Sequence, residues 1–375
     1  MKITQFISTL GFGGAESVVR DYAIELHKRG HEVTVIVLLP FLHNDNEKQL
    51  LDNGIKLRSI YEEIYWIKNT SLPLRVIRKP FRKHKIHAWL KKYLDNTIQN
   101  VLHVHLELLS FIPIGICSKL KTKLFFTCHN EVAYYFGKNC KGDFKYAKEL
   151  IEQDNMQLFA LHTRMKDELN SLFTVSNTAV MNNPVNIKRF LMQSKTREEM
   201  RKNLGISDSA FVVGNVGRFV KQKNHDFIIE VFNSLLKLNT TAVLVLVGDG
   251  ELRKSIELKC EELKIRNKVI FTGVRTDIPD VLSTFDVFFF PSIFEGLGIS
   301  LIEAQVKVPY CVTSSAVPVD TAVTNNVVFL PLSEPLDKWI DAIQNPSKYT
   351  SNAINHLEDY DIQNVISKLE GFYAK

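Results

Sequence analysis

Two glutamates with glycines between them stand in the segment PSIFEGLGISLIEAQ, residues 291–305. A carboxylate accepts two hydroxyl hydrogen bonds at once, so Glu295 and Glu303 both suit a ligand rich in hydroxyl groups. Ser300 and Glu303 also have the spacing of a capping box, in which Glu303 would only cap a helix. A capping box explains neither Glu295 nor the two glycines, so the pattern favours a binding site.

Two basic residues stand in the segment GRFVKQKN, residues 217–224, which follows the predicted strand FVVGNV and leads into a predicted helix. Arg218 offers a planar fork of donors and Lys223 a compact point charge, so together they suit a diphosphate. A solvated basic loop that binds nothing is the alternative interpretation.

A glycine-rich turn, GFGGAE at residues 11–16, follows the first predicted strand and opens the first predicted helix. Free backbone N–H groups and the positive end of the helix make such a turn a site for an anion. A dinucleotide-binding turn needs three spaced glycines, and Glu16 stands at the third position. The turn therefore gives only weak support to a dinucleotide, and a tight turn without a ligand is the alternative.

Short apolar runs alternate with segments of helical periodicity along the chain. In the helix expected at residues 15–30, Val18, Tyr22 and Leu26 recur at helical spacing and Gly30 ends the pattern. The expected strands are at residues 2–9, 32–39, 101–106, 123–129, 211–219, 241–250, 268–273 and 286–292. This alternation predicts an α/β protein with parallel sheets built from strand–helix–strand units.

The cycle of strands and helices restarts after a turn at Asn182, Asn183 and Pro184. A chain of 375 residues is also long for one core. We therefore expect a first domain at 1–190, a second at 191–345, and a C-terminal helical segment at 346–375 that returns to the first. Two doubly wound domains would place a ligand cleft at their interface, lined by loops at the carboxyl ends of the strands.

The composition is that of a globular protein in a reducing compartment. Apolar residues make up 45% and charged residues 23% of the chain, and the five cysteines are an odd number without paired spacing. The N-terminus has no long apolar signal segment. No apolar stretch reaches eighteen residues, so we expect no membrane span.

Five segments in order resemble the signatures of the family 4 glycosyltransferases. They are residues 10–35, 215–232, 244–257, 269–292 and 294–305, and the resemblance is most specific in residues 211–305. It implies the GT-B fold, in which two Rossmann-like doubly wound domains face each other across a cleft. It also implies a retaining, nucleotide-sugar-dependent enzyme, most similar to bacterial transferases of capsule and exopolysaccharide synthesis.

The resemblance assigns roles to individual residues. Glu295 would contact hydroxyls of the donor sugar, Glu303 the ribose hydroxyls, and His129 would lie near the reacting sugar. The other implied contacts are the diphosphate (Arg218, Lys223, Gly296, Leu297, Gly298, Ile299, and Gly13 and Gly14 from the first domain) and the base (Val274, Arg275). The sequence departs from the family pattern at Leu297, where phenylalanine is common, and at Val308, where glycine is common.

The implied reaction is transfer with retention, by front-face substitution in which the leaving phosphate helps to deprotonate the acceptor hydroxyl. The expected donor is a UDP-hexose or UDP-N-acetylhexosamine, and the acceptor a glycan, expected to be linked to polyprenyl diphosphate. We expect no cofactor, no metal and no nucleic-acid partner. The one Asp-x-Asp pattern, Asp359 to Asp361, is interpreted as incidental.

Three functions other than glycosyl transfer are alternatives. A sugar-nucleotide 2-epimerase shares the two-domain architecture, but it needs acid and base groups around the sugar that the sequence does not reveal. A non-catalytic partner subunit would be expected to lose the spaced glutamates or the cations, and all four are present. A dehydrogenase fits least well, because the dinucleotide pattern is incomplete.

One segment, residues 75–94, carries eight Lys or Arg, two His and no acidic residue. Its apolar residues Ile86, Trp89, Leu90 and Tyr93 fall at i, i+3, i+4 and i+7, which is helical spacing. The helix is expected to begin near residue 80, where Pro80 stands. The functional interpretation is a docking face for the anionic inner surface of the cell membrane, with the protein cytoplasmic and peripheral. The basic residues proposed for docking are Arg78, Lys79, Arg82 and Lys83. The alternative is an ordinary helix whose apolar stripe packs on its own core.

Overall fold

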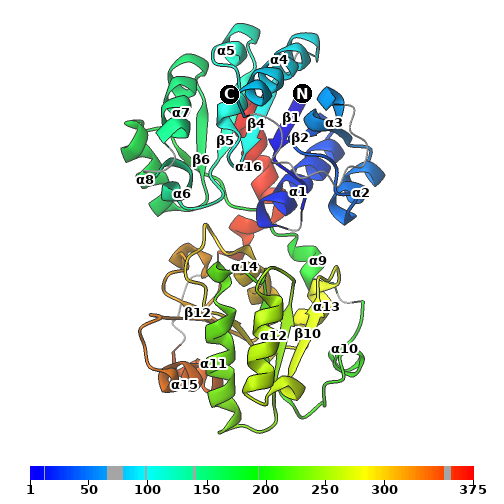
Figure 1. Cartoon of the computed structure of the whole chain (residues 1–375), viewed down its shortest axis with the longest axis vertical. Helices are drawn as coiled ribbons and strands as arrows, with labels where there is room; N and C mark the ends of the chain where they lie inside the picture. Colours follow the sequence, from blue (N-terminus) through cyan, green and yellow to red (C-terminus); the bar gives the residue numbers. More distant parts are fainter. Residues whose placement is uncertain (12, 66–78, 98, 138–140, 193, 350–355) are drawn as a thin grey trace. The chain divides into compact units, whose positions relative to one another are not determined.

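The computed structural model describes residues 1–11, 13–65, 79–97, 99–137, 141–192, 194–349 and 356–375 (Figure 1). Within them the chain forms two units. Unit 1 consists of Met1–Pro184 together with Ile362–Lys375, and unit 2 consists of Val185–Asp361. No helix in the described part of the chain is both long and apolar enough to cross a lipid bilayer.

Unit 1 is built on a parallel sheet with the strand order β3-β2-β1-β4-β5-β6-β7 among the described residues. The strands are β1 (Lys2–Ile7), β2 (Glu32–Val37), β3 (Lys56–Ser59), β4 (Val101–His105), β5 (Lys123–Thr127), β6 (Gln157–Ala160) and β7 (Ala179–Val180). The helices are α1 (Gly14–Lys28), α2 (Asp45–Asp52), α3 (Ile60–Tyr65), α4 (Lys79–Thr97), α5 (Ile116–Leu120), α6 (Val132–Phe136), α7 (Lys141–Asp154), α8 (Thr163–Phe173) and α16 (Ile362–Ala374).

Helix α1 shows why the local pattern predicts the element. Val18, Tyr22 and Leu26 recur every fourth residue and are all buried, because this spacing puts them on one face of a helix. The helix ends before Gly30, which takes a left-handed φ of 87° that favours glycine. The predicted stripe and its stop are therefore confirmed.

Unit 2 repeats the plan with a parallel sheet of strand order β10-β9-β8-β11-β12-β13 in the part that the structure describes. The strands are β8 (Phe211–Val216), β9 (Ala242–Val247), β10 (Val269–Gly273), β11 (Val287–Phe290), β12 (Tyr310–Ser314) and β13 (Val327–Leu330). The helices are α9 (Ile187–Leu191), α10 (Arg197–Asn203), α11 (His225–Leu236), α12 (Arg253–Glu262), α13 (Ile278–Leu282), α14 (Ile299–Lys307) and α15 (Leu336–Gln344).

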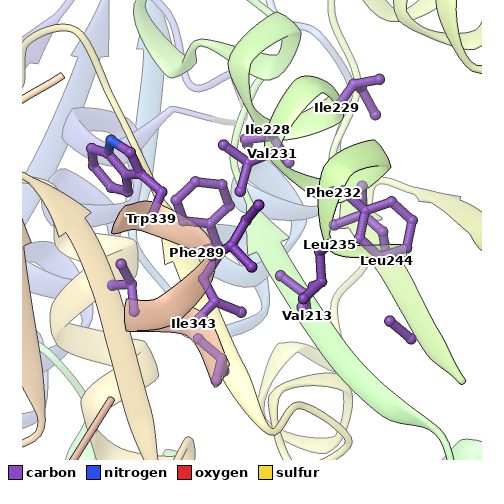
Figure 2. Close-up of a cluster of buried hydrophobic side chains, with 14 of the residues drawn as sticks. Val213, Ile228, Ile229, Val231, Phe232, Leu235, Leu244, Phe289, Trp339 and Ile343 are labelled. Carbon is purple, nitrogen blue, oxygen red and sulfur yellow. The ribbon is translucent and has the colours of Figure 1, made fainter. Parts of the chain in front are cut away.

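The core of unit 2 lies between its sheet and the helices that cover it. Figure 2 shows the side chains of α11, among them Phe232 and Leu235, above Val213 and Leu244 of the strands. Trp339 of α15 is fully buried, and its ring packs 5.7 Å from that of Phe289 between ring centroids. Large apolar side chains in this layer stabilise the sheet.

The sequence predicts most of this framework. Each of the eight expected strand segments contains an observed strand, and α11 begins at His225, next to the predicted start at Asn224. The strands β3, β6, β7, β12 and β13 are not among the expected segments. They have between two and five residues, too few to show a clear periodic pattern.

Candidate functional site

An ion pair joins the two motifs that the sequence singled out in unit 2. The Nζ atom of Lys223 lies 2.7 Å from Oε1 of Glu295, and the two side chains are 14% and 6% exposed. The second carboxylate oxygen of Glu295 accepts a hydrogen bond of 3.1 Å from Nε2 of Gln222. The ammonium group of Lys223 also lies 4.5 Å from the centre of the Phe290 ring, within range of a cation–π interaction. These contacts compensate the cost of removing both charges from water.

The sheet explains how residues 72 positions apart come to meet. Strands β8 and β11 are parallel neighbours, so the loops that follow them leave the same edge of the sheet. A backbone hydrogen bond of 2.8 Å from Ile293 to the carbonyl oxygen of Gln222 joins the two loops. A second bond of 3.1 Å runs from the side-chain amide of Asn224 to the carbonyl oxygen of Pro291. The loop geometry is therefore fixed independently of the ion pair.

Glycines under the basic loop allow its close packing. The stem of Lys223 lies over Gly217, where an added Cβ would come within 3.3 Å of Cδ of the lysine. Gly248 has a φ of 132°, and an added Cβ there would lie 2.1 Å from the carbonyl oxygen of Gly217. Glycine at position 248, in the VGDG segment, is thus required by this backbone contact rather than by a ligand.

The amino terminus of α14 lies beside this ion pair. Gly298 is the N-cap residue, with a left-handed φ of 86° and no side-chain cap. An added Cβ at Gly298 would lie 3.3 Å from Phe290 and 3.5 Å from Cγ of Glu295. The backbone N–H groups of Leu297, Gly298 and Ile299 make no hydrogen bond to another described residue. Uncapped amides at the positive end of a helix suit an anion.

The register of α14 rules out the capping box considered for Ser300 and Glu303. A capping box needs its serine at the N-cap, but the cap here is Gly298 and Ser300 lies inside the helix. Glu303 follows Ile299 by four positions, so both side chains lie on one face of α14.

The remaining site residues of unit 2 lie on two loops. Arg218 is exposed and has no ion-pair partner within the described ranges. Val274 follows β10 and is 50% exposed. Arg275 forms a two-armed pair of 2.8 Å and 2.5 Å with Asp277, and this pairing lowers the pKa of the Asp277 carboxyl below its usual value. Arg218 is therefore available to a ligand, whereas the side chain of Arg275 is already engaged.

In unit 1 the glycine turn precedes α1. Gly13 is the N-cap residue of α1 and Gly14 its first residue, whereas Phe12 lies outside the described residues. The carboxylate of Glu16 folds back over Gly13, where an added Cβ would lie 2.1 Å from it. Glu16, which stands at the third glycine position of the dinucleotide pattern, thus fills space that a glycine would leave open.

His129 follows β5 and is 9% exposed. Its Nε2 atom lies 2.9 Å from Nδ1 of His105, and Nε2 of His105 lies 2.7 Å from Oε1 of Gln5. Burial lowers the pKa of His129 to about 3. Sequence reasoning missed Gln5 and His105, although histidines at alternate positions of the apolar strand VLHVH were a signal that they share one face.

The basic segment is described only in part. Arg78 lies outside the described residues, and so do the side chains of Lys79 and Arg82. Lys83 lies with its ammonium group 4.2 Å from the centre of the Tyr146 ring. Of the predicted apolar stripe, Ile86, Leu90 and Tyr93 are buried in unit 1, and Trp89 is partly buried. The stripe therefore packs on the core of its own unit, as the alternative interpretation expects.

Two family models together cover most of the chain. Residues 12–189 match the model described as Glycosyltransferase Family 4, and residues 196–343 match Glycosyl transferases group 1. The chain belongs to the family 4 glycosyltransferases. This confirms the resemblance that the motifs indicated.

Similar proteins include named bacterial transferases. EpsF of Bacillus subtilis is 32% identical over 163 residues, 43% of this chain and 42% of EpsF. An Escherichia coli enzyme named UDP-Gal:alpha-D-GlcNAc-diphosphoundecaprenol alpha-1,3-galactosyltransferase is 27% identical over 237 residues, 62% of this chain and 58% of its own length. The matched stretches thus span about half the length of these two relatives.

Solved structures with the same fold cover the whole chain. Anabaena HepE, in complex with UDP-glucose, has a TM-score of 0.77 at 17% identity and covers 100% of this chain and 99% of its own. WaaG, a glycosyltransferase involved in lipopolysaccharide biosynthesis, has a TM-score of 0.69 at 16% identity, with 99% of this chain and 95% of WaaG covered. The predicted two-domain α/β GT-B fold is confirmed.

Proposed function

We propose that this glycosyltransferase moves a hexose or N-acetylhexosamine from a UDP-sugar to a glycan acceptor linked to a lipid diphosphate, with retention at the anomeric carbon. The observation that carries the proposal is the Lys223–Glu295 pair beside the uncapped amides of α14. One end of this arrangement attracts an anion and the other accepts hydroxyl hydrogen bonds. A nucleotide-diphosphate sugar has both features in one molecule.

Donor binding would redistribute the partners of this pair. The diphosphate competes with Glu295 for Lys223, and Arg218 and the amides of Gly298 and Ile299 add further positive charge. Glu295 would then turn its oxygens to the sugar hydroxyls. Glu303, on the Ile299 face of α14, would accept hydrogen bonds from the ribose.

Retention is proposed through front-face substitution. As the glycosidic bond breaks, negative charge grows on the leaving diphosphate, and Lys223 and Arg218 would stabilise it. A leaving phosphate oxygen would accept the proton of the acceptor hydroxyl on the same face of the sugar. Positioning of the two substrates supplies the rest of the acceleration.

Metal independence is part of this proposal, because Lys223 and Arg218 supply the positive charge that a divalent ion would otherwise provide. Transfer should proceed at the same rate in excess EDTA as in its absence. Loss of transfer in EDTA, restored by manganese, would show that a metal is needed.

The remaining roles in unit 1 and at the base are proposed by the same family match. Gly13 and Gly14 would bring backbone amides to the diphosphate, and His129 would contact the donor sugar. The main chain at Val274 and Arg275 would hold the base, which fits a loop whose arginine side chain is already paired with Asp277.

Relatives support the lipid-linked acceptor, because the Escherichia coli relative carries a diphosphoundecaprenol acceptor in its name. A protein that uses such an acceptor must work at the cytoplasmic membrane surface, and we propose the basic segment around Arg78, Lys79, Arg82 and Lys83 as its docking face. Each basic group near an anionic surface adds about 1 kcal/mol of binding.

Replacing all four basic residues with glutamine should abolish sedimentation with anionic liposomes and preserve nucleotide binding. Wild-type protein should sediment with anionic but not neutral liposomes, and high salt should release it because it shortens the Debye length. A quadruple variant that sediments like wild type would exclude this segment as the docking face.

The central experiment is a donor screen followed by a transfer assay. A donor present at a hundred times its dissociation constant should stabilise the protein by about 2.7 kcal/mol, which a thermal-shift assay detects. The donor found would be mixed with a lipid-diphosphate-linked sugar, and NMR of the product would give the anomeric configuration. Conversion of the donor to an epimer without an acceptor-linked product would favour the epimerase, and an inverted product would refute retention.

A further inference from the structure

A chain of polar side chains crosses the buried face of the unit 1 sheet. Gln5 on β1, His105 on β4 and His129 after β5 are joined by hydrogen bonds of 2.7 Å and 2.9 Å. At the other side, the hydroxyl of Tyr373 of α16 accepts a hydrogen bond of 3.1 Å from Nε2 of Gln5. The chain continues from that hydroxyl to Nδ1 of His103 at 2.6 Å, and from Nε2 of His103 to Oγ1 of Thr127 at 2.7 Å. All but His129 have no exposed surface. Buried polar groups of this kind are arranged by their hydrogen bonds.

The direction of each proton follows from Gln5. Since its Nε2 group donates to Tyr373, its Oε1 atom accepts, and the bond from His105 must be donated by Nε2–H. Burial lowers the pKa of His105 well below its usual value, so the ring is neutral and its Nδ1 atom is an acceptor. The bond between His105 and His129 is therefore donated by Nε2–H of His129.

The other nitrogen of His129 is left as a bare acceptor. With its single proton on Nε2, the neutral ring carries a lone pair on Nδ1. This atom is buried and has no hydrogen-bond partner among the residues that the structure describes. It lies at the carboxyl end of β5, the edge at which parallel sheets bind ligands. An unsatisfied buried acceptor is unfavourable, and a hydroxyl group of a ligand would satisfy it.

We propose that Gln5 and His105 are positioning residues that hold His129 in the Nε2–H tautomer, so that its Nδ1 atom accepts a hydrogen bond from a hydroxyl of the substrate. This proposal rests on the proposed role of His129 at the donor sugar and adds the group that recognises the hydroxyl. Because the pKa of His129 is about 3, the ring serves as a neutral acceptor and not as a proton carrier at neutral pH.

Two substitutions of His105 distinguish the effect of the His129 tautomer from the effect of packing. In His105→Asn, the amide oxygen takes about the place of Nδ1 and can still accept from His129. In His105→Leu, nothing accepts from His129, so its tautomer is no longer fixed. Thr4→Val is the matched control, because Thr4 is equally buried on β1 but faces the opposite side and bonds to Tyr93 and Gln99.

The decisive measurement is the ¹⁵N NMR signature of the His129 ring in the full-length protein with labelled histidine. Wild type and His105→Asn should show a protonated Nε2 and an unprotonated Nδ1. In His105→Leu the two nitrogens should shift towards an average, and kcat/KM for the donor should fall about tenfold. Thr4→Val should lower the melting temperature and change neither the tautomer nor kcat/KM.

A protonated Nδ1 in the wild type would overturn the proposal whatever the activity. It would also fail if His105→Leu kept the wild-type tautomer and kcat/KM. Failure of the proposed function is distinguishable, because it would appear as absence of transfer with every donor while the wild-type tautomer stayed as described. The wild-type spectrum tests the proposal even if His105→Leu does not fold.

Discussion

The two units share one architecture and place different chemistry on it. Both are parallel sheets in which a loop after the first strand, β1 or β8, leads into a helix through glycine. Unit 1 carries neutral histidines in hydrogen-bonded chains within its core. Unit 2 carries a charged pair, Lys223 and Glu295, at the end of its sheet. Glu295 is as deeply buried as His129, but its charge is paired with Lys223. The difference shows that this fold can present a neutral acceptor or a charge at this edge, depending on whether an oppositely charged partner is present.

Acidification should lower the stability of unit 1 more than that of unit 2. Burial lowers the pKa of His103, His105 and His129. In the unfolded chain these histidines have their ordinary pKa of about 6.5, so below that pH they bind protons that they do not bind in the folded unit. A depressed folded pKa gives stability that is present above pH 6.5 and lost as the pH falls. Each such histidine should reduce the unfolding free energy by up to about 1.4 kcal/mol per pH unit below 6.5.

Hydrogen exchange at pH 7 and pH 5, corrected for intrinsic rates, measures this difference. Amides of β4 should lose more protection than amides of β8. Equal losses in both sheets would show that the buried histidines do not set the acid sensitivity of unit 1.

The cations of unit 2 should give the largest effect on catalysis. Lys223→Ala and Arg218→Ala should each lower turnover about a hundredfold, equivalent to about 2.7 kcal/mol of lost charge stabilisation. Lys223→Ala should also lower the melting temperature, because it leaves the buried Glu295 without its partner. Arg218→Ala should not, since Arg218 is exposed and unpaired within the described ranges.

Lys221 provides the matched control on the same loop, because it is exposed and carries the same charge as Lys223. Lys221→Ala should keep turnover within about twofold of wild type, as a surface charge does. A hundredfold loss in Lys221→Ala as well would mean that the loop acts through its net charge and not through specific contacts.

Substitutions of the two glutamates of unit 2 should distinguish recognition of the sugar from recognition of the nucleotide. Glu295→Gln should lower transfer about tenfold and leave UDP affinity nearly unchanged, because its proposed partner is the sugar. Glu303→Ala should weaken UDP itself by about tenfold, because its proposed partner is the ribose. Calorimetric titration with UDP measures the second effect. A Glu303→Ala variant that is less stable but binds UDP normally would restrict Glu303 to a structural role.

At neutral pH, the smallest effect is expected at the buried histidine of unit 2. His225 stacks on Phe219 with ring centroids 4.1 Å apart, and neither of its ring nitrogens has a partner among the described residues. Burial lowers its pKa to about 4. His225→Phe keeps the stack and removes the titrating group, so its gain in stability should be about 2 kcal/mol larger at pH 5 than at pH 7. Denaturant titrations at both pH values measure this, and an equal change at both would contradict it.

Local patterns predicted the parts of the fold that are long or repetitive. The stripe in α1, the main strands and the family motifs could be read from neighbouring residues, because helix and strand periods appear in a short window. Edge strands such as β7, Ala179–Val180, have too few residues to show a period. The domain limits at 190 and 345 remain predictions, and in the structure the two units divide at Pro184 and Asp361.

The sequence by itself determined the family, the two α/β sheets and the residue types of the candidate site. Only the tertiary structure decided which of these residues meet. Lys223 pairs with Glu295 across 72 positions, because β8 and β11 are parallel neighbours and the loops after them leave the same edge of the sheet. His105 bonds to Gln5 across 100 positions, because β4 and β1 are neighbouring strands. Strand order, which no local period encodes, therefore turned separate motifs into an ion pair and an oriented histidine.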